Sequence, residues 1–204
     1  MKVYLVILYL ILFNLLYSQS DSTKIHQIDI LIDSLSIFAD SYPPNIESAE
    51  EMKNVIELFR QIETLLLDYS DELKNPDPLV EFRLGELYRM GHNLDIESSW
   101  NKSEKHLKKA IKLNPKDYEA YNILGLLYVN SGYPQQAEKV FLKAIDLSKP
   151  NHNLTAYSGL AFSYYYQGKR DEAIQMINQC LQIEPDNKYY ISLLNAFQAK
   201  GKTK

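Results

Sequence analysis

The chain has 204 residues, of which 46% are hydrophobic and 24% are charged, and this balance excludes a wholly disordered protein. Its seven glycines disfavour a many-stranded sandwich and a dinucleotide-binding fold, which need many tight turns or glycine-rich loops. A net charge of −4 argues against nucleic acid as a partner, and a single cysteine cannot form an internal disulfide.

The first twenty residues have the pattern of a secretory signal peptide. Lys2 is followed by an apolar run over residues 3–17, and small residues alternate at Ser18 and Ser20. The run is shorter than the roughly 17–25 residues that cross a bilayer. We therefore predict that residues 1–20 are removed and that the protein is secreted or held in the periplasm or cell envelope. The alternative is an uncleaved membrane anchor, since Leu16 and Tyr17 are bulky for a cleavage site.

Residues 21–77 are predicted to form a helical hairpin. Apolar residues recur at helical spacing over residues 25–38, Pro43 and Pro44 interrupt them, and Ser48 with Glu51 is typical of a helix start. A narrower apolar seam follows, stepping by three and four residues. It consists of Met52, Val55, Phe59, Ile62, Leu66, Tyr69 and Leu73. This seam has two interpretations: a cap over the end of a helical array, which we favour, or a dimerising helix with heptad spacing.

Residues 78–187 contain a pattern that occurs three times. The copies are Leu84-Gly85 with Tyr88, Leu124-Gly125 with Tyr128, and Leu160-Ala161 with Tyr164. A small or apolar stripe follows each copy: Ser103, Leu107 and Ala110; then Ala137, Phe141 and Ala144; then Ala173, Ile177 and Cys180. Gly or Ala in a first helix allows a second helix to approach closely. Gly132 and Gly168 are expected to end first helices, and Pro134 to begin a second one.

These motifs resemble the tetratricopeptide repeat family. The resemblance implies an all-α solenoid of helical hairpins with right-handed superhelical twist, made of three repeats and ending in a capping helix and tail over residues 188–204. The first repeat departs from the family pattern, because Tyr88 and Ser103 are farther apart than the matching residues of the later repeats. The extra residues predict a long loop from Met90 to Asn101. Cys180 stands where Ala is usual, and we interpret it as a structural residue.

No combination of residues indicates catalysis, so we predict that the protein is not an enzyme and has no catalytic residue, cofactor or metal. His92, Asp95 and Glu97 could supply metal ligands, but a solvated loop is the favoured interpretation. A catalytic site in the loop from Met90 to Asn101 is kept as a weaker hypothesis. Asn101 and Asn153 fit the glycosylation sequon, which matters only in a host with that machinery.

The resemblance also implies a concave groove lined by first helices, which would bind a peptide or a partner helix. The predicted partner-binding residues are Phe82, Glu86, Arg89, Glu119, Asn122, Leu126, Asn130, Ser158, Phe162, Tyr165, Tyr166 and Tyr189. Some family members hold a carboxylate with a clamp of Lys, Asn and Arg residues. That clamp is absent from the predicted partner-binding residues, so an apolar or aromatic peptide is favoured. The alternative for Phe162 and Tyr165 is packing against the next helix.

The predicted function is therefore an exported, non-catalytic scaffold for protein–protein interaction. Its partner is expected to be a protein or peptide, with no nucleic acid, and with the membrane involved only if the N-terminal segment is uncleaved. The alternative is a signal-anchored structural subunit that assists the assembly of an envelope complex.

Overall fold

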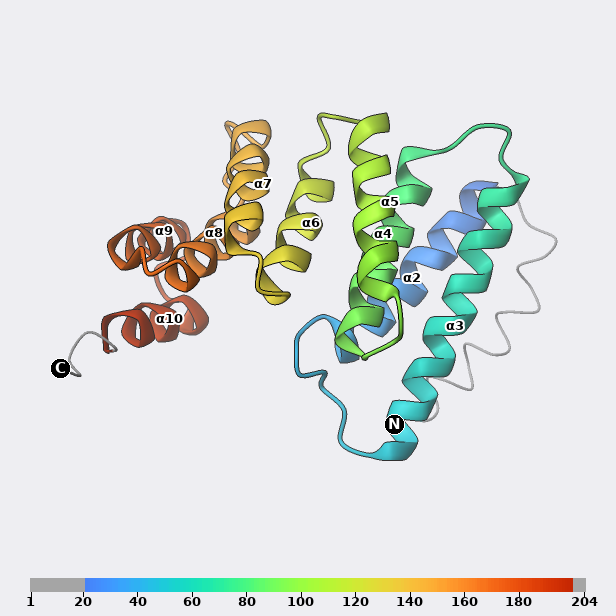
Figure 1. Ribbon diagram of the computed structural model, residues 1–204, viewed down its shortest axis with the longest axis horizontal. Helices are drawn as coiled ribbons and strands as arrows, with labels where there is room; N and C mark the ends of the chain where they lie inside the picture. The colour runs from blue at the N-terminus through green and yellow to red at the C-terminus, as the bar shows by residue number, and fades with distance from the viewer. Residues whose placement is uncertain (1–20, 200–204) are drawn as a thin grey trace. The chain divides into compact units, whose positions relative to one another are not determined.

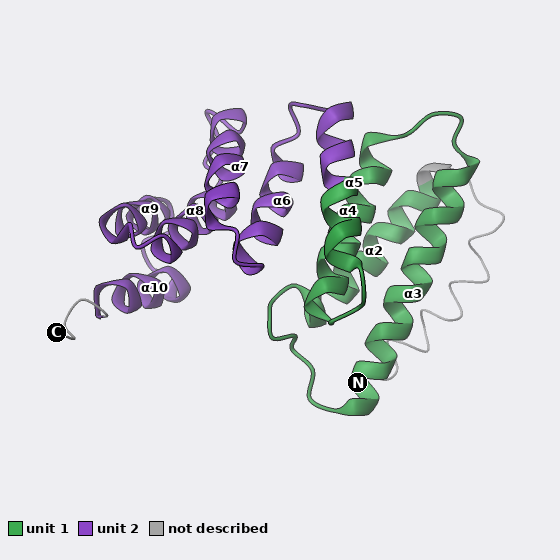
Figure 2. Ribbon diagram, viewed as in Figure 1, with its two compact units in different colours: residues 1–106 green, residues 107–204 purple. Residues whose placement is uncertain are grey.

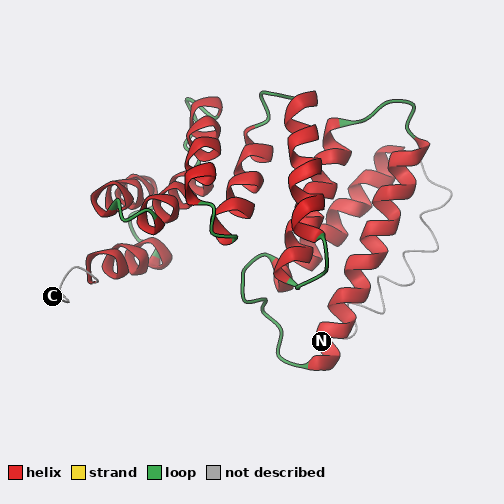
Figure 3. Cartoon of the chain, in the orientation of Figure 1, coloured by secondary structure: helices red, strands yellow, loops and turns green. Residues whose placement is uncertain are grey.

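The computed structural model describes residues 21–199, so the predicted signal peptide lies outside the described residues. Within that range every regular element is an α-helix, as Figure 3 shows. The helices are α2 (Asp21–Ala39), α3 (Ala49–Glu72), α4 (Pro78–Asn93), α5 (Ser99–Leu113), α6 (Tyr118–Asn130), α7 (Pro134–Leu147), α8 (Leu154–Tyr166), α9 (Arg170–Ile183) and α10 (Lys188–Ala199) (Figure 1). The predicted all-α class is confirmed. None of these helices is both long and apolar enough to cross a membrane.

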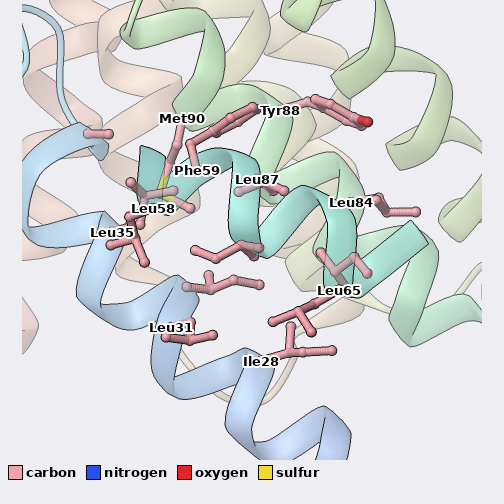
Figure 4. Packing of buried hydrophobic residues seen from close by; sticks show 14 of the residues in the cluster. Ile28, Leu31, Leu35, Leu58, Phe59, Leu65, Leu84, Leu87, Tyr88 and Met90 are labelled. Carbon is pink, nitrogen blue, oxygen red and sulfur yellow. The ribbon is translucent and has the colours of Figure 1, made fainter. Parts of the chain in front are cut away.

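The chain divides into two compact units at residue 106, within α5 (Figure 2). Unit 1 contains α2, α3, α4 and the first half of α5, and its core is formed mainly by α2, α3 and α4. Phe59, Ile62 and Leu66 of the apolar seam are fully buried in that core, and Figure 4 shows Phe59 beside Leu87 of α4. The central residues of the seam are therefore already covered by the chain itself and are not free to pair with a second copy.

The long loop predicted from Met90 to Asn101 is wrong. Helix α4 continues to Asn93 and α5 begins at Ser99, which leaves only residues 94–98 between them. The reason is that the extra residues pack inward. Met90 is buried in the core of unit 1, and the Asn93 amide donates hydrogen bonds to the carbonyl oxygens of residues 39 and 40, at 2.9 and 3.2 Å. These contacts lengthen the helix where sequence spacing alone indicated an open loop.

Unit 2 contains the α6–α7 and α8–α9 helix pairs followed by α10. Phe141 of α7 is fully buried, and its ring lies against Gly125 of α6 and Gly159 of α8. A Cβ atom added at Gly125 would lie 2.6 Å from the ring, and one added at Gly159 would lie 2.2 Å from it. Two glycines, one on each neighbouring helix, thus make room for one aromatic ring.

The turns that end α6 and α8 both depend on glycine. Gly132 and Gly168 have φ angles of +79° and +77°, a left-handed conformation that is strained for residues with a Cβ atom. The amides of the following residues, Tyr133 and Lys169, donate to the carbonyls of Tyr128 and Tyr164, both at 2.9 Å. This is the hydrogen bond that closes a helix end of the Schellman type. The prediction that these two glycines end first helices is confirmed.

We expect Gly168→Ala to lower the free energy of unfolding by about 1–2 kcal/mol. The cost arises from the backbone alone, because no atom lies within 4 Å of the position a Cβ would occupy. Gly168→Asn should be milder, since asparagine tolerates the left-handed region better than alanine. Urea denaturation followed by circular dichroism would compare the two variants, and equal losses for both would contradict this explanation.

Candidate functional site

The predicted binding residues of α4 are largely occupied by contacts within unit 1. The Arg89 side chain is only 2% exposed, and its guanidinium donates to the carbonyl oxygen of Asp40 at 2.9 Å and to the Asp40 carboxylate. Arg89 therefore holds the chain just after the end of α2. Phe82 is also buried, and Glu86 is paired with Arg83 at 2.9 Å. Burial raises the pKa of Glu86, and the neighbouring Arg83 opposes that shift.

The predicted residues of α6 are divided between interior and surface. Asn122 is 1% exposed, and its side-chain amide exchanges two hydrogen bonds with that of Asn153, at 3.1 and 3.2 Å. Asn153 also caps α8, because its side-chain oxygen accepts from the Ala156 amide at 3.0 Å. Glu119 and Asn130 are exposed. Asn122 therefore fixes the start of α8 and does not face an open groove.

The hydrogen-bonded pairing of Asn153 with Asn122 was not predicted from the sequence. Its position immediately before α8 is a helix-capping signal that the sequence does carry, but nothing local indicates that its amide meets Asn122, 31 residues earlier.

The predicted residues Phe162, Tyr165 and Tyr166 of α8 form one group of aromatic rings with Phe197 of α10. The Tyr165 ring stacks on Phe197 of α10, with centroids 4.5 Å apart, and Phe162 meets the same ring edge-on at 5.8 Å. Tyr166 lies beside both, 6.3 Å from Phe162 and 6.0 Å from Tyr165. Phe162 and Tyr165 therefore pack against a later helix, α10, as the alternative for these two residues predicted. Because Phe197 is buried beneath them, these rings are fixed in place by the core of unit 2.

Two of the predicted tyrosines are open to solvent. Tyr166 of α8 is 61% exposed and Tyr189 of α10 is 55% exposed. Burial raises the pKa of Tyr189, and the Cys180 thiol and the Tyr166 hydroxyl add to that shift. We call Phe162, Tyr165, Tyr166 and Tyr189 the aromatic surface.

Cys180 and the candidate metal ligands were the other residues considered for a chemical role. Cys180 is buried in unit 2, and burial raises its pKa to about 11, as expected for a structural thiol that stays protonated. Between residues 21 and 199, no group of three or more His, Cys, Asp or Glu side chains is arranged to hold a metal ion. Asp95 and Glu97 are exposed on the short connection between α4 and α5.

Comparison with known proteins identifies the repeats of unit 2. Residues 116–185 match the tetratricopeptide repeat family. This range covers the second and third repeats predicted from the sequence. A TPR repeat-containing protein of Methanocaldococcus jannaschii is 32% identical over 88 residues, which are 43% of this chain and 15% of that protein. The chain thus matches only a small part of the length of this relative.

Solved structures agree with the predicted fold. The thermophilic TPR protein TTC0263 of Thermus thermophilus superposes with a TM-score of 0.60 at 16% identity, over 85% of this chain and 92% of that one. YrrB, described as a TPR protein with an unusual peptide-binding site, gives a TM-score of 0.53 at 20% identity, over 89% of this chain and 87% of that one. Such low identities establish the fold, a TPR-like array of helix pairs, and nothing about the ligand.

Proposed function

We propose that this protein is a non-catalytic interaction scaffold that binds a peptide segment of a partner protein at the aromatic surface of α8 and α10. The observation that carries the proposal is the exposure of Tyr166 beside the rings of Phe162 and Tyr165, which pack on Phe197, together with the exposure of Tyr189 on α10. The peptide-binding site named for the similar structure YrrB is consistent with it.

Rigid exposed aromatic residues are effective binding anchors. A tyrosine buries a large area on contact while losing little side-chain entropy, and its hydroxyl can still donate a hydrogen bond. Tyr165 and Phe162 are already fixed by packing, so little further ordering is needed when a partner covers the surface. Arg89 and Asn122 are left out of the proposed surface because their side chains are buried and hydrogen-bonded within the chain.

We expect the double variant Tyr166→Ala and Tyr189→Ala to bind its partner at least about 30-fold more weakly, a loss of about 2 kcal/mol or more. The partner would first be captured with the mature chain and identified by mass spectrometry, and the dissociation constants of both proteins would then be measured by calorimetry. Leu142→Ala is a matched control, because Leu142 is a 46% exposed apolar residue on α7, outside the aromatic surface. Equal affinity of the double variant and the wild type would exclude this surface as the binding site.

We also propose that the protein is exported. The support is the pattern of residues 1–20, with Lys2, an apolar run and small residues at Ser18 and Ser20. N-terminal sequencing of the protein recovered from the soluble and membrane fractions of its host tests this. A first residue near Asp21 supports cleavage, whereas protein that begins at Met1 in the membrane fraction would favour the signal-anchored alternative.

A further inference from the structure

We infer that the segment bound by the aromatic surface is uncharged and extended, and is built mainly of proline with aliphatic or aromatic residues. This inference rests on the proposed function and specifies the chemistry of the partner. It follows from the charges near the surface and from the hydrogen-bonding groups that the surface leaves open.

The two helices that carry the aromatic surface are almost without charge. Helix α8 contains no Asp, Glu, Lys, Arg or His among its 13 residues, and the one charged residue of α10 is Lys188, which begins the helix. Lys169, just beyond α8, is bound to Glu138 at 2.9 Å. Glu184, just after α9, accepts a hydrogen bond from the Asn187 side-chain amide at 2.6 Å. A charged group of a partner placed on Tyr166 would therefore lose water without gaining a counter-ion from either helix.

A cation of the partner is not favoured by the rings alone. In three places within residues 21–199 a cation lies over an aromatic ring, and in each of them a carboxylate binds the cation as well. Arg83 lies 5.1 Å from the Phe82 ring and is bound to Glu86; Lys102 lies 4.7 Å from the Tyr88 ring and is bound to Glu63; Lys169 lies 5.3 Å from the Tyr164 ring and is bound to Glu138. Neither α8 nor α10 has an acidic residue to complete such a pair beside Tyr166 or Tyr189.

The hydrogen-bonding groups of the surface favour an extended segment over a helix. Within residues 21–199, the hydroxyls of Tyr166 and Tyr189 have no hydrogen-bond partner. An extended segment offers backbone carbonyls to these donors, whereas a helix uses most of its carbonyls internally. Proline fits this arrangement in three ways: its ring packs on a tyrosine face, it has no N–H that would be left unpaired, and its extended conformation is already formed before binding.

Synthetic peptides of 12 residues can test the inference directly. One labelled pool has proline at every third position with Leu, Tyr and Ala between, and two matched pools replace Ala by Glu or by Lys. Fluorescence anisotropy with the full chain would be measured at about 50 and about 500 mM NaCl. We expect the neutral pool to bind at least about tenfold more tightly than either charged pool, with less than about a twofold change between the two salt concentrations.

Four variants complete the test. Tyr166→Ala with Tyr189→Ala should abolish the binding of the neutral pool, Leu142→Ala should leave it unchanged, and Lys188→Gln should have no effect on it. The removal of only the two hydroxyls by Tyr166→Phe with Tyr189→Phe should weaken binding by about three- to tenfold.

Several results would overturn the inference. Tightest binding by the Glu or Lys pool, a strong fall in affinity with salt, or dependence on Lys188 would show that charge recognition dominates. If that binding were also lost in the Tyr166→Ala, Tyr189→Ala variant, the proposed function would stand and only the inference would fail. Absence of binding by every pool also overturns it, and the proposed function is then decided by the captured partner and the same double variant.

Discussion

Replacement of Phe141 by alanine is expected to lower the free energy of unfolding by about 3–5 kcal/mol. The ring is fully buried, and it fills the space that Gly125 and Gly159 leave on the two helices adjacent to α7. Neither glycine has a side chain that could move into the void, so the cavity can close only if α6 or α8 shifts. Urea denaturation, followed by circular dichroism, would measure the loss.

The neighbouring substitution Leu142→Ala is the control for this prediction. Leu142 is on the same helix but is exposed, so its loss should change stability by no more than about 0.5 kcal/mol. If Phe141→Ala lowered the free energy of unfolding by less than about 1.5 kcal/mol, the ring would not be the main contributor to packing between α6, α7 and α8. Gly159→Ala provides a converse check, because its new methyl group would overlap the ring and should also destabilise the fold.

Replacement of Arg89 by alanine should lower the free energy of unfolding by about 3 kcal/mol. Arg89 is among the largest fully buried side chains of the described chain, and its guanidinium bonds both the backbone carbonyl and the carboxylate of Asp40. A hydrogen bond to a charged group contributes about 1.5–3 kcal/mol, and the lost packing adds to that contribution. The effect would be measured as the shift of the urea midpoint at constant slope.

The partner side of this pair provides a graded comparison. The Asp40 carboxylate is mostly exposed, so Asp40→Asn should cost less than about 1 kcal/mol and leave the backbone contact in place. If Asp40→Asn were as damaging as Arg89→Ala, the carboxylate and not the burial of the guanidinium would account for the effect.

Local sequence signals predict the repeats well because each depends on one nearby physical requirement. Gly132 and Gly168 have the positive φ angles that a helix end of this kind needs, and Pro134 begins α7 where its missing N–H leaves no intrahelical bond unmade. The Ser48 cap of α3 is of the same local kind, with the Glu51 amide donating to its hydroxyl at 3.1 Å.

The binding stripe was harder to predict, because helical register gives the side of a helix and not the depth of a side chain. Arg89 and Asn122 are at stripe positions by spacing, yet each is buried by a partner far away in the chain, Asp40 and Asn153 respectively. The prediction of a long loop in the first repeat was wrong for a related reason. The Asn93 side-chain amide donates to backbone carbonyl oxygens at the end of α2, far away in the sequence. By contrast, Tyr166 and Tyr189 are exposed, because the ring contacts with Phe197 are made by Phe162 and Tyr165.

The single ring shared by α6, α7 and α8 bears on how this protein could be engineered. Shuffling of hairpins between repeat proteins assumes that each junction is interchangeable, but here the junction consists of Phe141 together with Gly125 and Gly159. A donor hairpin with alanine in place of Gly159 would meet the ring, and one without an aromatic at the Phe141 position would leave a hole. The transplantable module is therefore the triplet of residues with its three helices, and a cut after α7 would divide it.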